Sequence, residues 1–388
     1  MTQLALLGGT PAFPQGIPFV KPPAPPLARV AEILTPSWDR GFLTNGPLVA
    51  ELERRAADVL QVRHVVAVSS CTTGLMLALR ALAIEGSVVL PSFTFSASAH
   101  AVAWNGLAPR FAECDPASFQ LSPADAKDRL DGAAALLATH VFGAPCSPKE
   151  VEDVARLAGV PVVFDAAHAF GAIHAGVPVG GFGDAEVFSL TPTKPLVAGE
   201  GGLVATSRDD VAHGVRIGRD YANPGDYDTQ FVGLNGRMSE MHAATALASL
   251  ETYEANQARR FELVERYRAR LAAIPGIRVQ AVAATDRSSW KDFTIAVDDE
   301  YGVDRDALRR VLSAEGVDTR TYFDPPVHRQ QAYRGATEGV LAVTDDVSRR
   351  VLSLPIYPAL DDGVVDGITQ VIAAVADKSD QIAQTVSA

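Results

Sequence analysis

The chain has 388 residues, of which 47% are hydrophobic and 21% charged, a composition typical of soluble globular proteins. Acidic residues outnumber basic ones by 46 to 34, and the formal net charge of -12 disfavours broad electrostatic binding to nucleic acid or to an anionic membrane. No apolar run approaches the ~18 residues of a membrane helix, and the start lacks a secretory signal, so we expect a cytoplasmic protein. The cysteines Cys71, Cys114 and Cys146 show no CxxC spacing, which predicts neither a disulfide framework nor a metal site.

The first predicted unit is a proline-rich segment, residues 1–30, which we expect to run as an extended arm over the surface and outside any core. In residues 31–250, short apolar runs alternate with helical or loop segments. This alternation predicts a large α/β domain with a mostly parallel central sheet flanked by helices. The predicted strands are HVVAV, SVVLP, APRFAE, AAALLATHV, PVVFD, AEVFSL and GGLVAT.

A long helix is predicted next, because the capping sequence Ser239-Glu240 opens a helical pattern that continues to Pro275-Gly276. Two further apolar runs follow it, IRVQAV and DFTIAV. The segments DRDALRRVLSAEG and DDGVVDGITQVIAAVADK have helical patterns. We therefore expect residues 251–388 to form a small C-terminal α+β domain.

Three polar stretches come directly after predicted strands, the position at which open α/β sheets bind their ligands. The first is SSCTTG, which precedes an apolar helix. Small hydroxyl residues, a glycine and free N–H groups at a helix N-terminus can hold a phosphate. Taken alone, this stretch fits an ordinary strand-to-helix turn with a threonine cap equally well.

The second stretch contains Asp165, which ends the apolar strand PVVFD, and His168 three residues later. A carboxylate is costly to bury there unless it meets a cation or a strong donor. A protonated pyridine nitrogen is one such donor. Taken alone, Asp165 fits a helix cap or a metal ligand equally well, although no second acidic ligand is evident nearby.

The third stretch places Lys194 between Pro192 and Pro195, 29 positions after Asp165 (194 minus 165) and just before the glycine-rich GEGG. Prolines and glycines fix a compact loop between two strands. A lysine held in such a loop can be desolvated and lose its proton readily, as a Schiff-base amine must. A solvated loop lysine is the simpler interpretation of this stretch alone.

In this order, the three stretches resemble those of the DegT/DnrJ-type sugar aminotransferases, members of the aspartate-aminotransferase fold class of pyridoxal-phosphate (PLP) enzymes. The resemblance extends over nearly the whole chain and includes GFLTNGPLVAELE, LPSFTFSASAHAVAWNG, THVFGAPC, GLNGRMSEMHAATALASLE, TYFDPPVH and LPIYPAL. It implies PLP as the cofactor, an amino-acid donor, expected to be glutamate, and a nucleotide-linked keto sugar as the acceptor. The FDAAHAFG, THVFGAPC and FLTNGP variants are more similar to enzymes of 4-keto sugars; a 3-keto sugar or another cyclic ketone is the alternative.

The resemblance also implies a role for each matching residue. Lys194 corresponds to the lysine that carries the cofactor, and Asp165 to the partner of the pyridine nitrogen. His168 takes the position beside the phenolic oxygen, and Phe95 the position stacked on the ring. The implied phosphate contacts are Thr72, Thr73, Ser189 and, from the neighbouring subunit of a homodimer with shared sites, Asn235. The candidates for substrate binding are Thr44, Arg237 and His328.

The chain departs from the family pattern at positions that border the expected sugar space. Cys71 replaces a usual glycine, Leu190-Thr191 replaces an aromatic residue and a histidine, and Leu234 and Gly236 replace tyrosines that often flank the asparagine. None of these changes removes an implied cofactor contact. They put contacts on the substrate side in doubt.

Three other functions fit the sequence less well than a sugar aminotransferase. A PLP-dependent sugar dehydratase of the same fold has histidine in place of the cofactor lysine, so Lys194 argues against it. A nicotinamide-dependent oxidoreductase is disfavoured because no GxGxxG opens a helix after the first strand. A regulatory or nucleic-acid-binding protein on this scaffold is disfavoured by the acidic charge balance and by the presence of both Lys194 and Asp165.

Overall fold

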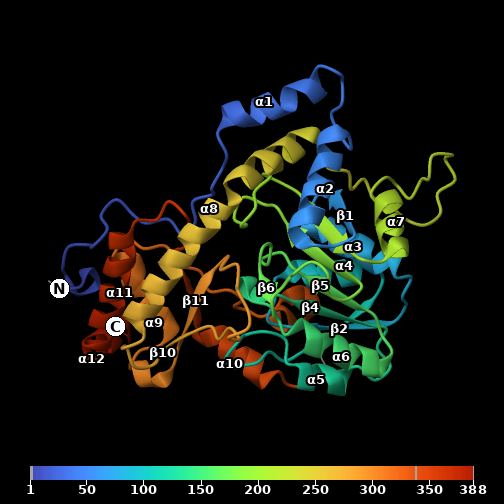
Figure 1. Cartoon of the computed structure of the whole chain (residues 1–388). Helices are drawn as coiled ribbons and strands as arrows, with labels where there is room; N and C mark the ends of the chain where they lie inside the picture. Colours follow the sequence, from blue (N-terminus) through green and yellow to red (C-terminus); the bar gives the residue numbers. More distant parts are fainter. Residues whose placement is uncertain (1–2, 337–338, 388) are drawn as a thin grey trace.

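Seven short apolar runs form one central sheet in the computed structural model, which describes residues 3–336 and 339–387 (Figure 1). The strand order is β1-β9-β8-β5-β4-β2-β3; β9 is antiparallel to both neighbours, and all other neighbours pair in parallel. The predicted mostly parallel sheet is therefore confirmed. Its strands are β1 His64–Val68, β2 Ser87–Pro91, β3 Ala108–Ala112, β4 Ala135–Thr139, β5 Val162–Asp165, β8 Ala185–Ser189 and β9 Gly202–Thr206.

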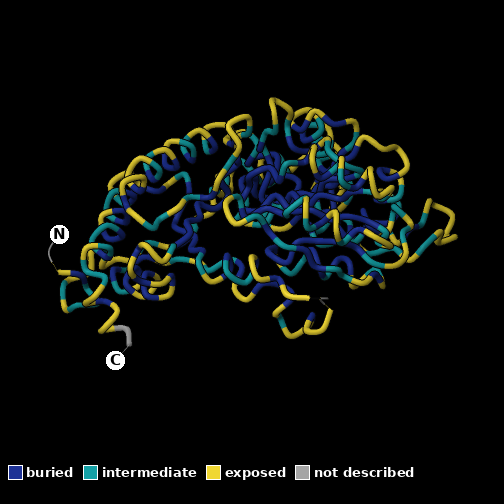
Figure 2. Tube along the Cα trace, turned by 90° about the horizontal axis from the view of Figure 1, so that it is seen from below, coloured by how far each residue is buried: buried dark blue, intermediate teal, exposed yellow. Residues whose placement is uncertain are grey.

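Helices cover both faces of this sheet, which explains why its strands are apolar on both sides. In β1, Val66 and Val68 pack towards one helical layer, and Val65 and Ala67 towards the other. The buried residues accordingly concentrate inside the layers (Figure 2). The first layer contains α3 Cys71–Ala81, α4 Ser96–Trp104 and α7 Asp209–Gly218; the second contains α2 Pro47–Leu60, α5 Pro123–Arg129, α6 Pro148–Ala158 and part of α8 Glu240–Leu271.

Helix α8 joins this large part of the molecule to the small one (Figure 1). Ser239 caps it as predicted, because its Oγ accepts a hydrogen bond from the N–H of His242. The buried carboxylate of Glu240 accepts N–H hydrogen bonds at the start of α2, where an anion is favoured by the helix dipole. Helix α1 (Leu27–Trp38) packs along α8. The helix ends at Leu271, slightly before the predicted Pro275-Gly276.

The small part has a three-stranded antiparallel sheet in the order β10-β11-β12, covered by helices. Strand β12 was not predicted, because it follows helix α10 with no turn residue between them. The elements are β10 Ile277–Val279, β11 Phe293–Val297, β12 Val351–Leu354, α9 Arg305–Ala314, α10 Ala342–Arg350, α11 Asp362–Ala376 and α12 Ser379–Ser387. Minor elements are β6 Ile173–His174, β7 Val177–Pro178 and the 3₁₀ turns Ala5–Leu7, Val141–Gly143, Asp299–Tyr301, Val327–Arg329 and Gln331–Tyr333.

The proline-rich N-terminal segment lies against the small part, and the expectation that it stays outside any core is wrong. Leu4 and Phe19 are buried, and Leu4 belongs to the core formed with α9 and α11. The carboxylate of Glu315 accepts hydrogen bonds from the N–H groups of Ala5 and Ala12, each at 2.7 Å. Phe13 and Ile17, which lie between prolines, pack against the same core, which the local sequence pattern could not reveal.

The predicted boundary between residues 250 and 251 falls inside α8, a helix that contributes to both parts. The division into an arm, a large domain and a small domain remains a prediction. Among the described residues, no helix combines the length and the apolarity that crossing a membrane would require.

Candidate active site

A cavity of about 360 Å³ lies where β1, β5 and β8 end, at the carboxyl edge of the parallel strands. Residues of the small part complete its lining. The cavity brings together residues that are far apart in the sequence. The predicted site residues that line it are Thr72, Phe95, Asp165, His168, Ser189 and Lys194.

Asp165 ends β5 and is only 3% exposed. The Ser98 hydroxyl donates a hydrogen bond to its Oδ2 at 2.6 Å, and the N–H of Ala167 donates to its Oδ1 at 3.1 Å. Behind Ser98, the hydroxyl of Thr94 lies 3.1 Å from the Ser98 hydroxyl. Burial raises the pKa of Asp165, whereas the two hydrogen bonds and the charge of Lys194 act in the opposite direction. The carboxylate is thus held in one orientation by fixed donors.

His168 follows Asp165 on the cavity wall and is itself buried. The N–H of Phe142 donates to His168 Nδ1 at 3.1 Å, so a neutral ring carries its proton on Nε2. Burial, with the positive charges of Lys194 and Lys291, lowers the pKa of His168. The ring is therefore neutral at ordinary pH and offers a single N–H donor.

Lys194 is partly buried in the loop between β8 and β9. Its backbone N–H donates to the carbonyl of Thr191 at 3.0 Å, which closes the predicted tight turn. Removal from water and the charge of Lys291 lower the pKa of the Lys194 amine to about 8, while Asp292 opposes this shift. A larger fraction of this amine is unprotonated near neutral pH than for a lysine in water.

The start of α3 provides hydroxyl and N–H groups at the cavity. Ser70 caps the helix: its Oγ accepts a hydrogen bond from the N–H of Thr73 at 3.1 Å. Ser70, Thr72 and Ser189 line the cavity, whereas the hydroxyl of Thr73 lies 3.0 Å from Ser70 Oγ, outside the lining. Ser70 belongs to the predicted SSCTTG stretch but was not among the named phosphate contacts, and the helix cap is this serine where the sequence suggested a threonine.

Three predicted residues lie near the surface, outside this cavity. Asn235 is exposed and pairs through its backbone with Asp220. Arg237 forms an ion pair with Asp220, and Thr44 donates to the carbonyl of Met238 at 3.0 Å. None of the three contributes to the cavity of its own chain.

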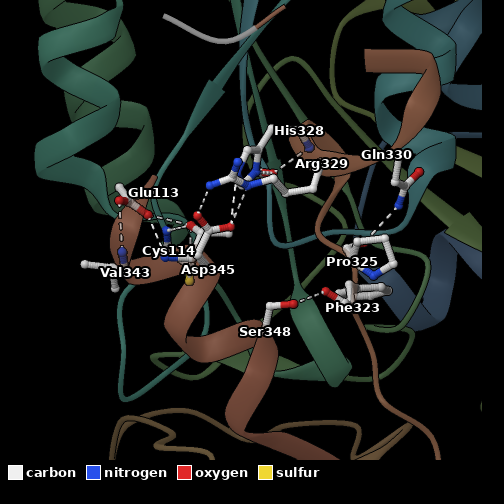
Figure 3. Close-up of polar contacts among 12 residues, drawn as sticks. Glu113, Cys114, Phe323, Pro325, His328, Arg329, Gln330, Val343, Asp345 and Ser348 are labelled. Carbon is white, nitrogen blue, oxygen red and sulfur yellow. Dashed lines mark hydrogen bonds and ion pairs between the residues drawn. The ribbon is translucent and has the colours of Figure 1, made fainter. Parts of the chain in front are cut away.

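His328 lies in a polar joint between the two parts of the molecule (Figure 3). Its Nδ1 is 2.6 Å from the hydroxyl of Ser92, and its Nε2 is 3.2 Å from an oxygen of Asp345, which also pairs with Arg329. Glu113 supports the joint by accepting hydrogen bonds at the start of α10. The structure places His328 in this joint and not in the cavity lining.

The sequence did not predict the cavity residues of the small part: Lys291, Tyr322 and Phe323. The Lys291 ammonium lies 5.4 Å from the centre of the Tyr322 ring, and Phe323 packs against Phe93 of the large part. These residues reach the cavity only when the two parts pack together. The available signal was a lysine directly before the predicted apolar run DFTIAV.

The fold and the cavity together define the class of the protein, a PLP-dependent aminotransferase: a lysine and a buried carboxylate at the carboxyl edge of a mostly parallel sheet, beside a small antiparallel domain. The chain belongs to the DegT/DnrJ/EryC1/StrS aminotransferase family, whose profile matches residues 28–375. This match agrees with the resemblance seen in the sequence motifs.

Individual relatives support the assignment over most of the chain. A dTDP-4-amino-4,6-dideoxy-D-glucose transaminase from Escherichia coli is 31% identical over 92% of this chain and 98% of the relative. A dTDP-3-amino-3,4,6-trideoxy-alpha-D-glucose transaminase from Streptomyces venezuelae is 32% identical over 91% of this chain and 93% of the relative. The crystal structure of DesI with its TDP-sugar product superposes with a TM-score of 0.94 at 35% identity, covering 99% of both chains.

The lowered pKa of Lys194 predicts how its amine reacts with PLP in the cofactor-free protein. The rate constant of covalent attachment should rise with pH and level off above about 8, because only the unprotonated amine attacks an aldehyde. Stopped-flow absorbance of the bound cofactor measures this profile. Lys149→Met, which removes an exposed lysine, should leave it unchanged. A rise that continues to about 10.4, the value of a lysine in water, would contradict the assignment.

Proposed function

We propose that the enzyme transfers the amino group of L-glutamate to a nucleotide-linked 4-keto sugar. The observation that carries this proposal is the near-complete structural match to DesI, whose structure contains a TDP-sugar product. The Escherichia coli relative is named for a sugar aminated at carbon 4. The Streptomyces venezuelae relative is named for a 3-amino sugar, so a 3-keto sugar is the second candidate.

The residues lining the cavity fit PLP by the chemistry of their donors and acceptors. Asp165 offers a carboxylate for the ring nitrogen, His168 an N–H for the phenolic oxygen, and Lys194 an amine for the aldehyde. The Phe95 ring is 59% exposed and free to stack on the cofactor. The groups available for the phosphate are the start of α3 and the hydroxyls of Ser70, Thr72 and Ser189.

The bound cofactor supplies an electron sink for the substrate carbon that loses its proton. Lys194 moves that proton: its Nζ accepts it from the amine-bearing carbon of the donor and returns a proton to the acceptor carbon in the second half of the reaction. A pKa of about 8 suits both directions near neutral pH. Asp165 keeps the ring nitrogen protonated, and the Ser98 hydrogen bond fixes the carboxylate for that purpose.

We also propose a homodimer in which Asn235 of each chain contacts the phosphate held by the other chain. Its exposure and its position outside its own cavity support this arrangement. The preceding loop extends beyond α7 (Figure 1) and carries Tyr227 and Val232, which are 93% and 79% exposed. Apolar side chains so exposed are typical of a surface that a partner covers.

The first test incubates the protein with L-glutamate and a panel of nucleotide-linked 4-keto and 3-keto sugars, with products identified by mass. We expect the amino sugar from the 4-keto substrates. Lys194→Ala should abolish turnover and retain the far-ultraviolet circular dichroism of the parent, because only the reacting amine is lost. In the parent, borohydride reduction and peptide mapping should find the cofactor on Lys194. Attachment to another lysine, or exclusive use of 3-keto sugars, would refute the corresponding part of the proposal.

Shared active sites predict complementation between two inactive variants, Lys194→Ala and Asn235→Asp, in which the new carboxylate repels the phosphate. A hybrid dimer then has one site with both native residues. After complete subunit exchange of an equal mixture, about a quarter of parental activity should return, since half of the dimers are hybrids with one native site. If the exchanged mixture stays inactive, Asn235 acts in its own chain or in no site.

A further inference from the structure

Lys291 is a second lysine in the cavity, besides Lys194, and neither the motifs nor the proposed chemistry gives it a role. Its side chain is only 4% exposed. Its Nζ donates to both carboxylate oxygens of Asp292, at 2.7 and 2.8 Å. An ammonium has three N–H donors, so one remains for a ligand in the cavity.

The backbone around Lys291 is fixed against the large part of the molecule. The Ser289 hydroxyl donates to the carbonyl of His168 at 2.5 Å, and the N–H of Ser289 donates to the carbonyl of Gly143 at 3.0 Å. Trp290 has a φ of 49°, a left-handed conformation that a bulky residue adopts only when its surroundings impose it. Lys291 is therefore held at a defined position relative to His168.

Contacts of the next residue show which end of the cavity Lys291 occupies. The N–H of Asp292 donates to the carbonyl of Phe142 at 3.4 Å, and the N–H of Phe142 donates to His168 Nδ1 at 3.1 Å. Lys291 therefore lies on the His168 side of the cavity, where its charge lowers the pKa of both His168 and Lys194.

We propose that Lys291 binds the α-carboxylate of the amino-acid donor. Among the described residues that line the cavity, Lys194 and Lys291 are the cationic ones, and Lys194 is committed to proton transfer. An amino acid brings a carboxylate next to its amine-bearing carbon, and a charged hydrogen bond to a fixed ammonium is the strongest anchor that the cavity offers. This inference rests on the proposed function in that the donor is an amino acid.

Asp292 explains how the same cavity accepts two different substrates. The keto sugar has no carboxylate beside its reacting carbon, so a lone ammonium would be buried without a partner whenever the sugar is bound. Burying an unpaired charge is strongly unfavourable. The two hydrogen bonds to Asp292 pair the Lys291 ammonium while the keto sugar is bound. They leave its third N–H free for the carboxylate while the amino-acid donor is bound.

The test separates the two half-reactions in single turnovers, followed by cofactor absorbance. Because Lys291→Met alone would leave Asp292 buried and unpaired, the main variant is Lys291→Met with Asp292→Asn. Lys291 and Asp292 act on the pKa of Lys194 in opposite directions, so the double variant removes both effects together. Lys291→Arg retains a cation, and Lys149→Met is the control for loss of a distant lysine.

In the double variant, the half-saturating concentrations of L-glutamate and 2-oxoglutarate should rise about 10- to 100-fold, the range expected for one charged hydrogen bond. The dissociation constant of α-methyl-L-glutamate, which has no α-proton to transfer, should rise by the same factor. The half-saturating concentration of the keto sugar should change less than about threefold, because the sugar makes no contact with Lys291 in this proposal. The single variant Lys291→Arg, which keeps a cation at this position, should retain most of the parental affinity for glutamate.

Unchanged half-saturation by glutamate would overturn the inference, and so would an equal loss for glutamate and the keto sugar, which indicates a general structural role. Failure of the proposed acceptor gives a different pattern. The parent would then convert amino acids but no nucleotide-linked sugar, and the comparison of glutamate binding between parent and variants would still decide the role of Lys291.

Discussion

A carboxylate at the end of a buried central strand is unfavourable unless fixed donors face it, and the rest of the site is arranged around this constraint at Asp165. Ser98 and the N–H of Ala167 provide donors from the protein. The carboxylate can be stabilised further from the cavity side, by the charge of the nearby Lys194 and by a protonated ring nitrogen such as that of PLP. The parallel strands matter because they bring Asp165 and the Lys194 loop to the same edge of the sheet.

The small part of the molecule completes the site with the ion pair of Lys291 and Asp292, in which the positive charge is balanced by a neighbouring carboxylate. Lys291 arrives paired with Asp292, so the cavity gains an ammonium without an uncompensated buried charge. The position of this pair depends on how the two parts pack. Helix α8 and the polar joint around His328 connect them, and His328 itself lies outside the cavity lining.

Features set by local physics could be predicted from the sequence. Apolar runs gave the seven strands, the Ser239 cap gave the start of α8, and the position after strand ends gave Asp165 and Lys194. Features that depend on distant packing could not be predicted. Leu4 is buried by helices far along the chain, and Lys291 reaches the cavity only through tertiary contacts. His328 shows the same limit, because its neighbours Ser92 and Asp345 come together only through tertiary packing.

The central claim is that the Asp165 carboxylate maintains the charge on which amino transfer depends. Its most direct measurement is the rate constant of the glutamate half-reaction in Asp165→Asn, in which an amide of the same shape can still accept from Ser98. We predict that this variant binds PLP but transfers the amino group about 10²-fold or more slowly, as expected when a buried charge at the reacting group is lost. A rate constant within a few-fold of the parent would contradict the account.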